Sequence, residues 1–259
     1  MLSMEIRRIG RRPLFWLLLL LGLFLALWPV IQTWPQGLTK NDYALYPRSA
    51  YVSWMFFVSD TYPIYLLIFP LLAALAFSDA YAEDFNTGLI KGILTKVAKR
   101  KYLLVRYSTN FVVGGAVTIF PLVINFLAEM SAYPLIQNNY YFGMPLVNQD
   151  SFWPALFYSH PFLYTWIRIL IIFLFGGMLS SFALAFSTVI KNRYVVVVFP
   201  FLVYMGLDSV FTAFPGFTPI SSLYLKDVQT TWQLPVYLLV GIVGSFVWYF
   251  AVGQRNETI

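Results

Sequence analysis

Side chains that could carry out catalysis are scarce in this sequence. It contains one histidine, His160, and no cysteine, which excludes disulfides, thiolate metal sites and cysteine nucleophiles. His160 precedes Pro161 at the end of an apolar stretch, and we interpret it as an interfacial residue. Neither the G-x-x-x-x-G-K-S/T pattern of a phosphate-binding loop nor the G-x-S-x-G pattern of a serine nucleophile occurs. We therefore expect no metal site, no nucleotide site and no catalytic residue in this chain.

Two ionisable residues interrupt long apolar stretches. Arg168 lies about seven residues, or roughly 10 Å of helix, from the end of one stretch, and Asp208 lies at a comparable depth in the next. Charged side chains inside a membrane usually face the bundle interior and pair with one another. We therefore predict that Arg168 pairs with Asp208, or failing that with Glu129 or Asp60, as a structural clamp. Alternatively, Arg168 extends to the outer interface and Asp208 lies there.

A third group of polar residues lies between positions 79 and 106. Apolar residues recur there at i, i+3, i+4 and i+7 from Ile90 to Val97, which is the spacing of a short amphipathic helix. Glu83 and Asp84 lie just upstream, where negative charge suits a helix N-terminus, and basic residues follow, where positive charge suits a C-terminus. The segment predicts a short helix between two apolar stretches, lying along the inner face of a membrane.

The composition identifies the surroundings of these residues. Hydrophobic residues make up 59% of the 259 positions and charged residues only 11%, whereas globular chains have about 25% charged residues. Such a chain cannot cover a water-facing surface, and it is too apolar to be disordered. The net charge of +6 does not require nucleic acid, because basic residues collect on the cytoplasmic side of membrane proteins. We predict an all-α, multi-pass membrane protein.

Six stretches are long enough to cross the hydrocarbon core, which takes about 20 residues of helix. We expect these spans near residues 14–34, 61–81, 107–129, 162–190, 194–214 and 234–252, within one domain covering residues 1–259. The first stretch is interpreted as a span and not as a signal peptide, because it is long and no A-x-A-like site follows it.

The basic residues predict the orientation. Most of the 17 lysines and arginines lie before the first span, between the second and third, after the fourth, and in the tail. Lys40, Arg48 and Lys226 lie on the opposite side. Because positive charge marks the cytoplasmic side, we expect both termini in the cytoplasm.

Two shorter segments allow alternative interpretations. Residues 1–12 form an amphipathic pattern, which fits an interfacial anchor on anionic lipid or an elbow helix that also contacts a cytoplasmic partner. Residues 215–233 include Pro215, Gly216 and Pro219. That segment either dips partway into the membrane, with its backbone polar groups shielded by protein, or forms an ordinary surface loop.

The segment from Asp79 to Leu103 resembles the cytoplasmic segment after the second helix of type-2 ABC exporter permeases. In that family an acidic residue lies a few positions before a glycine, and an amphipathic coupling helix, a basic residue and an aromatic residue follow. The corresponding residues here are Glu83 or Asp84, Gly88, Leu94, Arg100 and Tyr102. Many members have proline before the basic residue, where this chain has Ala98. The six spans and the N-terminal elbow helix are also similar to that family.

The resemblance implies a permease subunit in the cell membrane of a bacterium. Two such subunits, alike or different, would line a substrate path, and each would rest its coupling helix, within residues 82–104, in a groove of a separate ATPase subunit that binds ATP and Mg. Export of a substrate is implied by the resemblance alone. The implied coupling residues are Glu83, Asp84, Thr87, Gly88, Lys91, Leu94, Arg100 and Tyr102.

The cargo and the competing functions follow from weaker signals. An aromatic content of 20% and little buried charge suit an amphipathic or apolar cargo such as a peptide, a lipid-linked molecule or a drug. Without an ATPase partner, the chain would be a membrane sensing or assembly protein whose amphipathic helix merely lies on lipid. An intramembrane enzyme would need clustered catalytic residues, and a secondary transporter would usually show broken helices in paired halves. Membrane lipids are expected partners, and nucleic acid is not.

Overall fold

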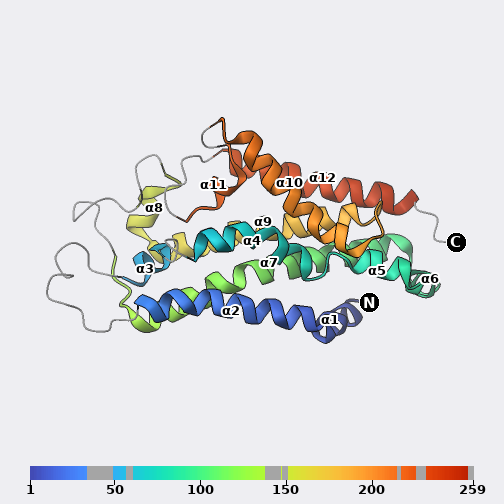
Figure 1. Ribbon diagram of the computed structural model, residues 1–259, viewed down its shortest axis with the longest axis horizontal. Coiled ribbons are helices and arrows are strands. Elements are labelled where there is room, and N and C mark those ends of the chain that lie inside the picture. Colours follow the sequence, from blue (N-terminus) through green and yellow to red (C-terminus); the bar gives the residue numbers. More distant parts are fainter. Residues whose placement is uncertain are drawn as a thin grey trace.

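The computed structural model describes residues 1–33, 49–56, 61–137, 147, 151–214, 217–225 and 232–255 (Figure 1). Within these ranges the chain forms helices and turns, with no strand. Some residues considered above lie outside the described ranges. They are Asp60, which was a possible partner of Arg168, and the three basic residues assigned to the outer side, Lys40, Arg48 and Lys226.

In the described part of the chain, six helices are long and apolar enough to cross a membrane, with mean hydropathy between 1.8 and 2.6. This confirms the predicted all-α architecture with six candidate spans, as in a multi-pass membrane protein. The six are α2 (Pro13–Thr33), α4 (Tyr62–Leu75) together with α5 (Ala80–Asn86), α7 (Lys99–Ala132), α9 (Pro161–Phe186), α10 (Arg193–Phe211) and α12 (Gln233–Arg255).

The third span differs most from its predicted limits. It was expected near residues 107–129, but α7 begins at Lys99 and ends at Ala132. The difference arises because helical hydrogen bonding continues through the polar residues before Tyr107, whereas apolar composition alone marks only the part that suits hydrocarbon. The predicted coupling segment, 82–104, therefore includes the first turns of α7.

Five short helices complete the described structure: α1 (Leu2–Arg11), α3 (Ala50–Phe56), α6 (Leu89–Leu94), α8 (Pro154–Ser159) and α11 (Pro219–Leu223). The long helices run side by side along the long axis of the molecule (Figure 1). One end, which we call the charged end, carries α1, α5, α6 and the first turns of α7 and α10. Helices α3 and α8 lie at the opposite end.

Helices α7 and α9 form the centre of the bundle. They approach closely at Gly114 and Gly115 of α7 and at Gly176 and Gly177 of α9, where an added Cβ would overlap a side chain of the facing helix. The outer helices are much less buried than α9. In an 18-residue apolar stretch of each helix, only 17% to 28% is buried for α10, α12 and α2, against 72% for α9. The outer helices therefore leave most of their apolar surface for lipid or for another chain.

Candidate functional site

A network of arginines and carboxylates holds the charged end together. Arg106 of α7 is completely buried and forms ion pairs with Glu5 of α1 and Asp84 of α5. Both carboxylates are also buried. The Tyr102 hydroxyl donates a hydrogen bond to Asp84 over 2.8 Å, and the Arg8 guanidinium lies 2.7 Å from the same carboxylate. Because buried charges are tolerated when they are paired and hydrogen-bonded, these contacts fix α1, α5 and α7 to one another.

A partly exposed layer of ion pairs extends this network to α10. Arg12, which follows α1, pairs with Asp79 and with Glu83, and Arg193 at the start of α10 lies 2.7 Å from Asp79. In the buried centre, desolvation raises the pKa of the Glu5 carboxyl above its ordinary value, although the adjacent arginines oppose this. The network thus joins α1, α5, α7 and α10, of which only α5 and α7 are close together in the sequence.

Helix α6 packs against α5 and α7 and faces outward. Gly88 precedes it with a φ of 70°, a left-handed conformation that favours glycine. Ile90 and Ile93 turn inward and are buried in an apolar cluster with residues of α5 and α7. Leu89 is 44% exposed and Lys91 is exposed, so the outward face combines apolar and basic side chains.

The helix is shorter than the pattern from Ile90 to Val97 predicts, because α6 ends at Leu94. The chain then turns, and Ala98 has an extended conformation before α7 begins at Lys99. Val97 still packs against the same apolar cluster as Ile90. The periodic pattern therefore reflects burial of one face across a helix and the turn that follows it.

The predicted coupling residues fall into two groups in the structure. Asp84 and Tyr102 are buried, and Glu83 is half-buried against arginines. These three position α5 and α7 and do not form an outward surface. The other predicted coupling residues form the outward surface. They are the exposed Thr87, Gly88, Lys91 and Arg100 and the half-buried Leu94.

The turn between α9 and α10 also contacts this region. The Asn86 side chain donates to the backbone carbonyl of Lys191 over 2.9 Å. The Lys191 ammonium donates to two backbone carbonyls at the end of α9 and lies 4.6 Å from the ring centroids of Tyr81 and Phe85. Partial burial lowers the pKa of Lys191 to about 8. Because residues of α5 contact Lys191, a displacement of α5, or of α6 next to it, would also displace the connection between α9 and α10.

Farther from the charged end, α11 is packed into the bundle. Leu223 and Leu225 belong to the main apolar core, and the Tyr62 hydroxyl donates to the Leu223 carbonyl over 2.6 Å. The Thr218 side chain accepts a hydrogen bond from the Ser221 N–H at the start of the helix. The surface-loop interpretation of this segment is therefore wrong for residues 219–225, which pack into the core and have protein partners for several of their backbone polar groups.

Arg168 and Asp208 hold the two ends of α11 and do not form the predicted pair with each other. The Asp208 carboxylate accepts a hydrogen bond from the Ile220 N–H over 3.2 Å, and Arg168 donates to the Tyr224 carbonyl. A carboxylate at a helix N-terminus and a guanidinium at its C-terminus match the partial charges there. Arg168 also lies 5.4 Å from the centroid of the Phe152 ring. It is completely buried, so the alternative in which it reaches the interface is wrong as well.

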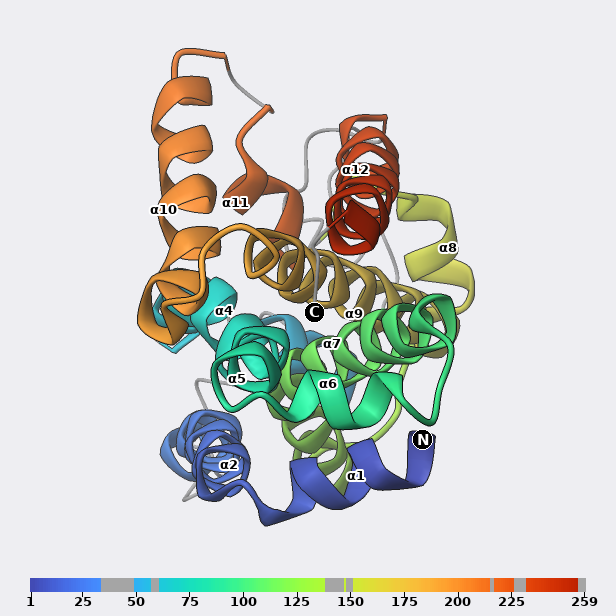
Figure 2. The same cartoon turned by 90° about the vertical axis from the view of Figure 1, so that its right-hand side faces the viewer.

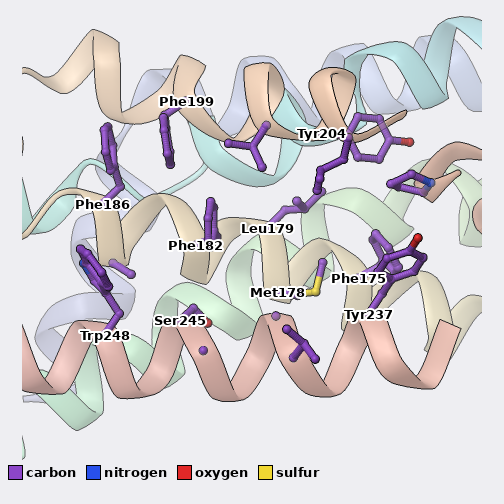
Figure 3. Close-up of a pocket in the computed structure, with 17 residues that line it drawn as sticks. Phe175, Met178, Leu179, Phe182, Phe186, Phe199, Tyr204, Tyr237, Ser245 and Trp248 are labelled. Atoms are coloured by element: carbon purple, nitrogen blue, oxygen red, sulfur yellow. The ribbon is translucent and has the colours of Figure 1, made fainter. Parts of the chain in front are cut away.

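An apolar cleft of about 560 Å³ lies between α9, α10 and α12 (Figure 3). In the end-on view of Figure 2, α10 and α12 both lie above α9, apart from each other, with α11 between them. Phe186 and Trp248 lie toward the charged end of the cleft, and Tyr204 and Tyr237 lie toward the other, near α11 (Figure 3). Its lining comprises Phe175, Met178, Leu179, Phe182, Ala185 and Phe186 of α9, Phe199, Val203, Tyr204 and Leu207 of α10, Pro219 of α11, and Tyr237, Val240, Gly241, Gly244, Ser245 and Trp248 of α12.

The cleft offers few polar groups, and none of its lining residues is acidic or basic. The Ser245 hydroxyl is within 3.0 Å of the Tyr107 hydroxyl, and the Tyr237 hydroxyl donates to the Phe217 carbonyl. The Tyr204 hydroxyl has no hydrogen-bond partner among the described residues. An apolar molecule could thus enter without leaving a charge unpaired.

The sequence reasoning did not identify this cleft. A partial signal exists, because Phe175, Leu179, Phe182 and Phe186 recur at the spacing of one helix face. That spacing predicts an apolar face but not whether another helix covers it. Comparisons with protein-family models, with curated proteins and with solved structures find no match to this chain.

Proposed function

We propose that this chain is the membrane-spanning permease subunit of an ABC transporter. The observation that carries the proposal is the outward-facing α6, which follows a left-handed glycine and lies between α5 and α7, two helices that a buried ion pair joins. The segment that contains α6 is the one that resembles the coupling segment of type-2 ABC exporter permeases. In this proposal the charged end is cytoplasmic, because basic residues gather there, and the cell membrane of a bacterium is the location.

The physical role of α6 would be to transmit force. It follows α5, which continues the α4 span, and it precedes α7. Ion pairs join α5 and α7 to α1, which leads into α2, and also join α5 to α10. A partner that contacts α6 differently in two states would shift the populations of two arrangements of the spans. The chain has no phosphate-binding loop, so ATP and Mg would be bound by that partner.

The outward face of α6 indicates what the partner surface would be. Leu89 and the preceding Phe85 are 44% and 38% exposed, and Lys91 of α6 and Lys96 after it are also exposed. An apolar groove with an acidic rim would complement this face. The largely exposed α2, α10 and α12 offer surfaces for a second permease subunit, identical or homologous. The cargo would be amphipathic or apolar, and its movement would be export.

Co-purification tests this function. The tagged wild-type chain, extracted from its native membrane, is expected to bring down a subunit that carries the phosphate-binding loop of ABC ATPases and to show ATP hydrolysis in the purified complex. Leu89→Glu should abolish both, because it places a carboxylate at the centre of the proposed contact. Leu135→Glu is the matched control, since Leu135 is similarly exposed at 48% and follows α7 at the opposite end of the bundle.

The outcomes separate the competing functions. Loss of the ATPase subunit in Leu89→Glu and its retention in Leu135→Glu support the proposal. Failure of the wild-type chain to bring down any such subunit would instead favour a membrane sensing or assembly protein that works without an ATPase. Equal retention in both variants would show that α6 is not the contact.

A further inference from the structure

We propose that the cleft between α9, α10 and α12 binds one acyl chain of an anionic membrane lipid, with the headgroup at the charged end of the bundle. The proposal requires only that the helix bundle lies in a membrane. It does not depend on an ATPase partner or on transport, so it can stand or fall separately from the function proposed above. Three features carry it, namely the dimensions of the cleft, the chemistry of its lining and the cation beyond its mouth.

The dimensions fit a single extended chain. Along α12 the lining runs from Tyr237 to Trp248, which at 1.5 Å per residue is roughly 16 Å. The hydrocarbon core of a bilayer is about 30 Å thick, so one leaflet contributes about 15 Å. The cleft is therefore as long as the acyl region of one leaflet.

A helix from a second copy of the chain is the competing occupant, because α10 and α12 leave most of their apolar surface exposed. Such a helix over the mouth would keep lipid out, and the cleft residues would then attach no more of a lipid probe than the exposed face of α2 does.

The lining and the opening suit hydrocarbon. Apolar and aromatic side chains make nearly all of the surface, and no acidic or basic residue contributes. The cleft lies between two helices that expose most of their apolar surface, with Val240 of α12 at 63% and Leu202 of α10 at 61% exposed. An acyl chain could thus move in from the surrounding bilayer without crossing water. An empty cleft would forfeit the dispersion contacts that such a chain supplies.

The position of the cleft identifies the leaflet and the headgroup. Its mouth toward the charged end is marked by Trp248 and by Phe186, which is the last residue of α9. Tryptophan is enriched at membrane interfaces. Residues 237, 241, 244, 248 and 255 share one face of α12 because they follow its 3.6-residue repeat. Arg255, which is exposed, therefore lies two turns beyond Trp248, where it would attract the phosphate of an anionic lipid.

The opposite end of the cleft is closed by protein. Pro219 of α11 and Tyr237 of α12 lie there, and the ends of α11 are held by Asp208 and Arg168. The methyl end of the chain would stop against α11, and the headgroup would stay at the charged end. The bound lipid would fill the space between α10 and α12, which both pack on α9.

Photo-crosslinking in nanodiscs tests the proposal. The probe is a phosphatidylglycerol with a diazirine on one acyl chain, and the sites of attachment are mapped by mass spectrometry. Attachment to cleft residues of α9 and α12 is expected in the wild-type chain, above the level on the lipid-exposed face of α2. Gly244→Phe should lower cleft attachment by about tenfold, since the ring occupies the apolar surface that the chain would bury. An added Cβ at Gly244 meets no atom within 4 Å.

A matched control and a headgroup variant complete the test. Gly206→Phe on α10 also adds a Cβ in open space, but Gly206 does not line the cleft, so attachment should equal that of the wild-type chain. In Arg255→Gln the preference for the phosphatidylglycerol probe over a phosphatidylcholine probe should disappear. Undiminished attachment in Gly244→Phe, or in a milder Gly244→Leu, would overturn the site. A preference that persists in Arg255→Gln would overturn the assignment of the headgroup.

Discussion

Arg106 and Arg168 are both completely buried, but the two side chains have different kinds of partner. Arg106 has two carboxylate partners, Glu5 and Asp84, each from a different helix. Arg168 has a backbone carbonyl as its hydrogen-bond partner and the face of an aromatic ring beside it. Among the described residues, two of its guanidinium nitrogens have no hydrogen-bond partner.

The difference shows what each region is built to do. A buried ion network is costly to assemble and costly to break, because removing one member leaves an uncompensated charge. Such a network suits the charged end, where α1, α5, α7 and α10 have to stay together under α6. A guanidinium on a helix C-terminus is a weaker attachment. The arrangement around α11 therefore fixes a short helix without joining two charged side chains directly.

The largest effect is expected from removing the centre of the charged network. Arg106→Met should lower the free energy of unfolding by about 3–5 kcal/mol, because Glu5 and Asp84 would remain buried without their partner. Thermal unfolding of the purified chain in detergent measures the loss. The triple variant Arg106→Met, Glu5→Gln, Asp84→Asn should recover much of it, since no charge is then left buried. A single variant as stable as the wild-type chain would contradict a stabilising network.

A smaller loss is expected at the other arginine. Arg168→Met should cost about 1–3 kcal/mol, which is the range for leaving a buried polar group without its hydrogen bond. The same unfolding measurement applies, and hydrogen exchange should show the loss of protection concentrated in residues 219–225. Tyr62→Phe, which removes the other side-chain donor at that helix end, is a companion variant. A loss for Arg168→Met equal to that for Arg106→Met would erase the distinction between the two regions.

The sequence predicts these two regions unequally well. The candidate spans follow from composition, because a run of about 20 apolar residues is typical of a helix that crosses a membrane. The depth of Arg168 and Asp208 within their helices also follows from their positions. Their partners do not, because sequence spacing gives depth along a helix but not which neighbour it faces. Nothing in the pattern showed that α11 would fold between them.

The charged end illustrates a related limit. Within the segment from Asp79 to Leu103, the pattern from Ile90 to Val97 correctly predicts a short amphipathic helix between two spans, although α6 ends at Leu94. The inward direction of Asp84 and Tyr102 was not foreseen, because it depends on Arg106, which appeared in the sequence as one more basic residue of a loop. Contact with Glu5, about 100 positions earlier in the chain, depends on tertiary packing that periodicity does not report.

Double-mutant cycles compare the two regions directly. Asp84→Asn and Arg106→Met should interact by more than about 1 kcal/mol, because the two side chains form one ion pair. Arg168→Met and Asp208→Asn should interact more weakly, because they hold opposite ends of α11 and do not form an ion pair, so only their shared helix couples them. Both cycles use the free energy of unfolding in the same detergent. An interaction between Arg168 and Asp208 as large as that between Asp84 and Arg106 would support the direct ion pair that is absent from the structure.

The smallest expected effect is the pH dependence of the stability that the charged network contributes. It arises from the titration of Glu5. Burial raises the pKa of Glu5 above its ordinary value of 4.5, so the folded state holds this proton more tightly than the unfolded state. The stability linked to Glu5 is therefore fully present below about pH 4.5 and is lost as the pH rises through the higher pKa of the folded protein. Glu5→Gln is the control, because its side chain cannot lose a proton. As the pH rises from about 4.5 through the pKa of folded Glu5, the unfolding temperature of the wild-type chain should fall relative to that of Glu5→Gln. A relative rise would mean that the ion pair with Arg106 outweighs desolvation at this carboxylate. The charged network would then stabilise the fold by attraction between its charges, in still sharper contrast with the helix end held by Arg168.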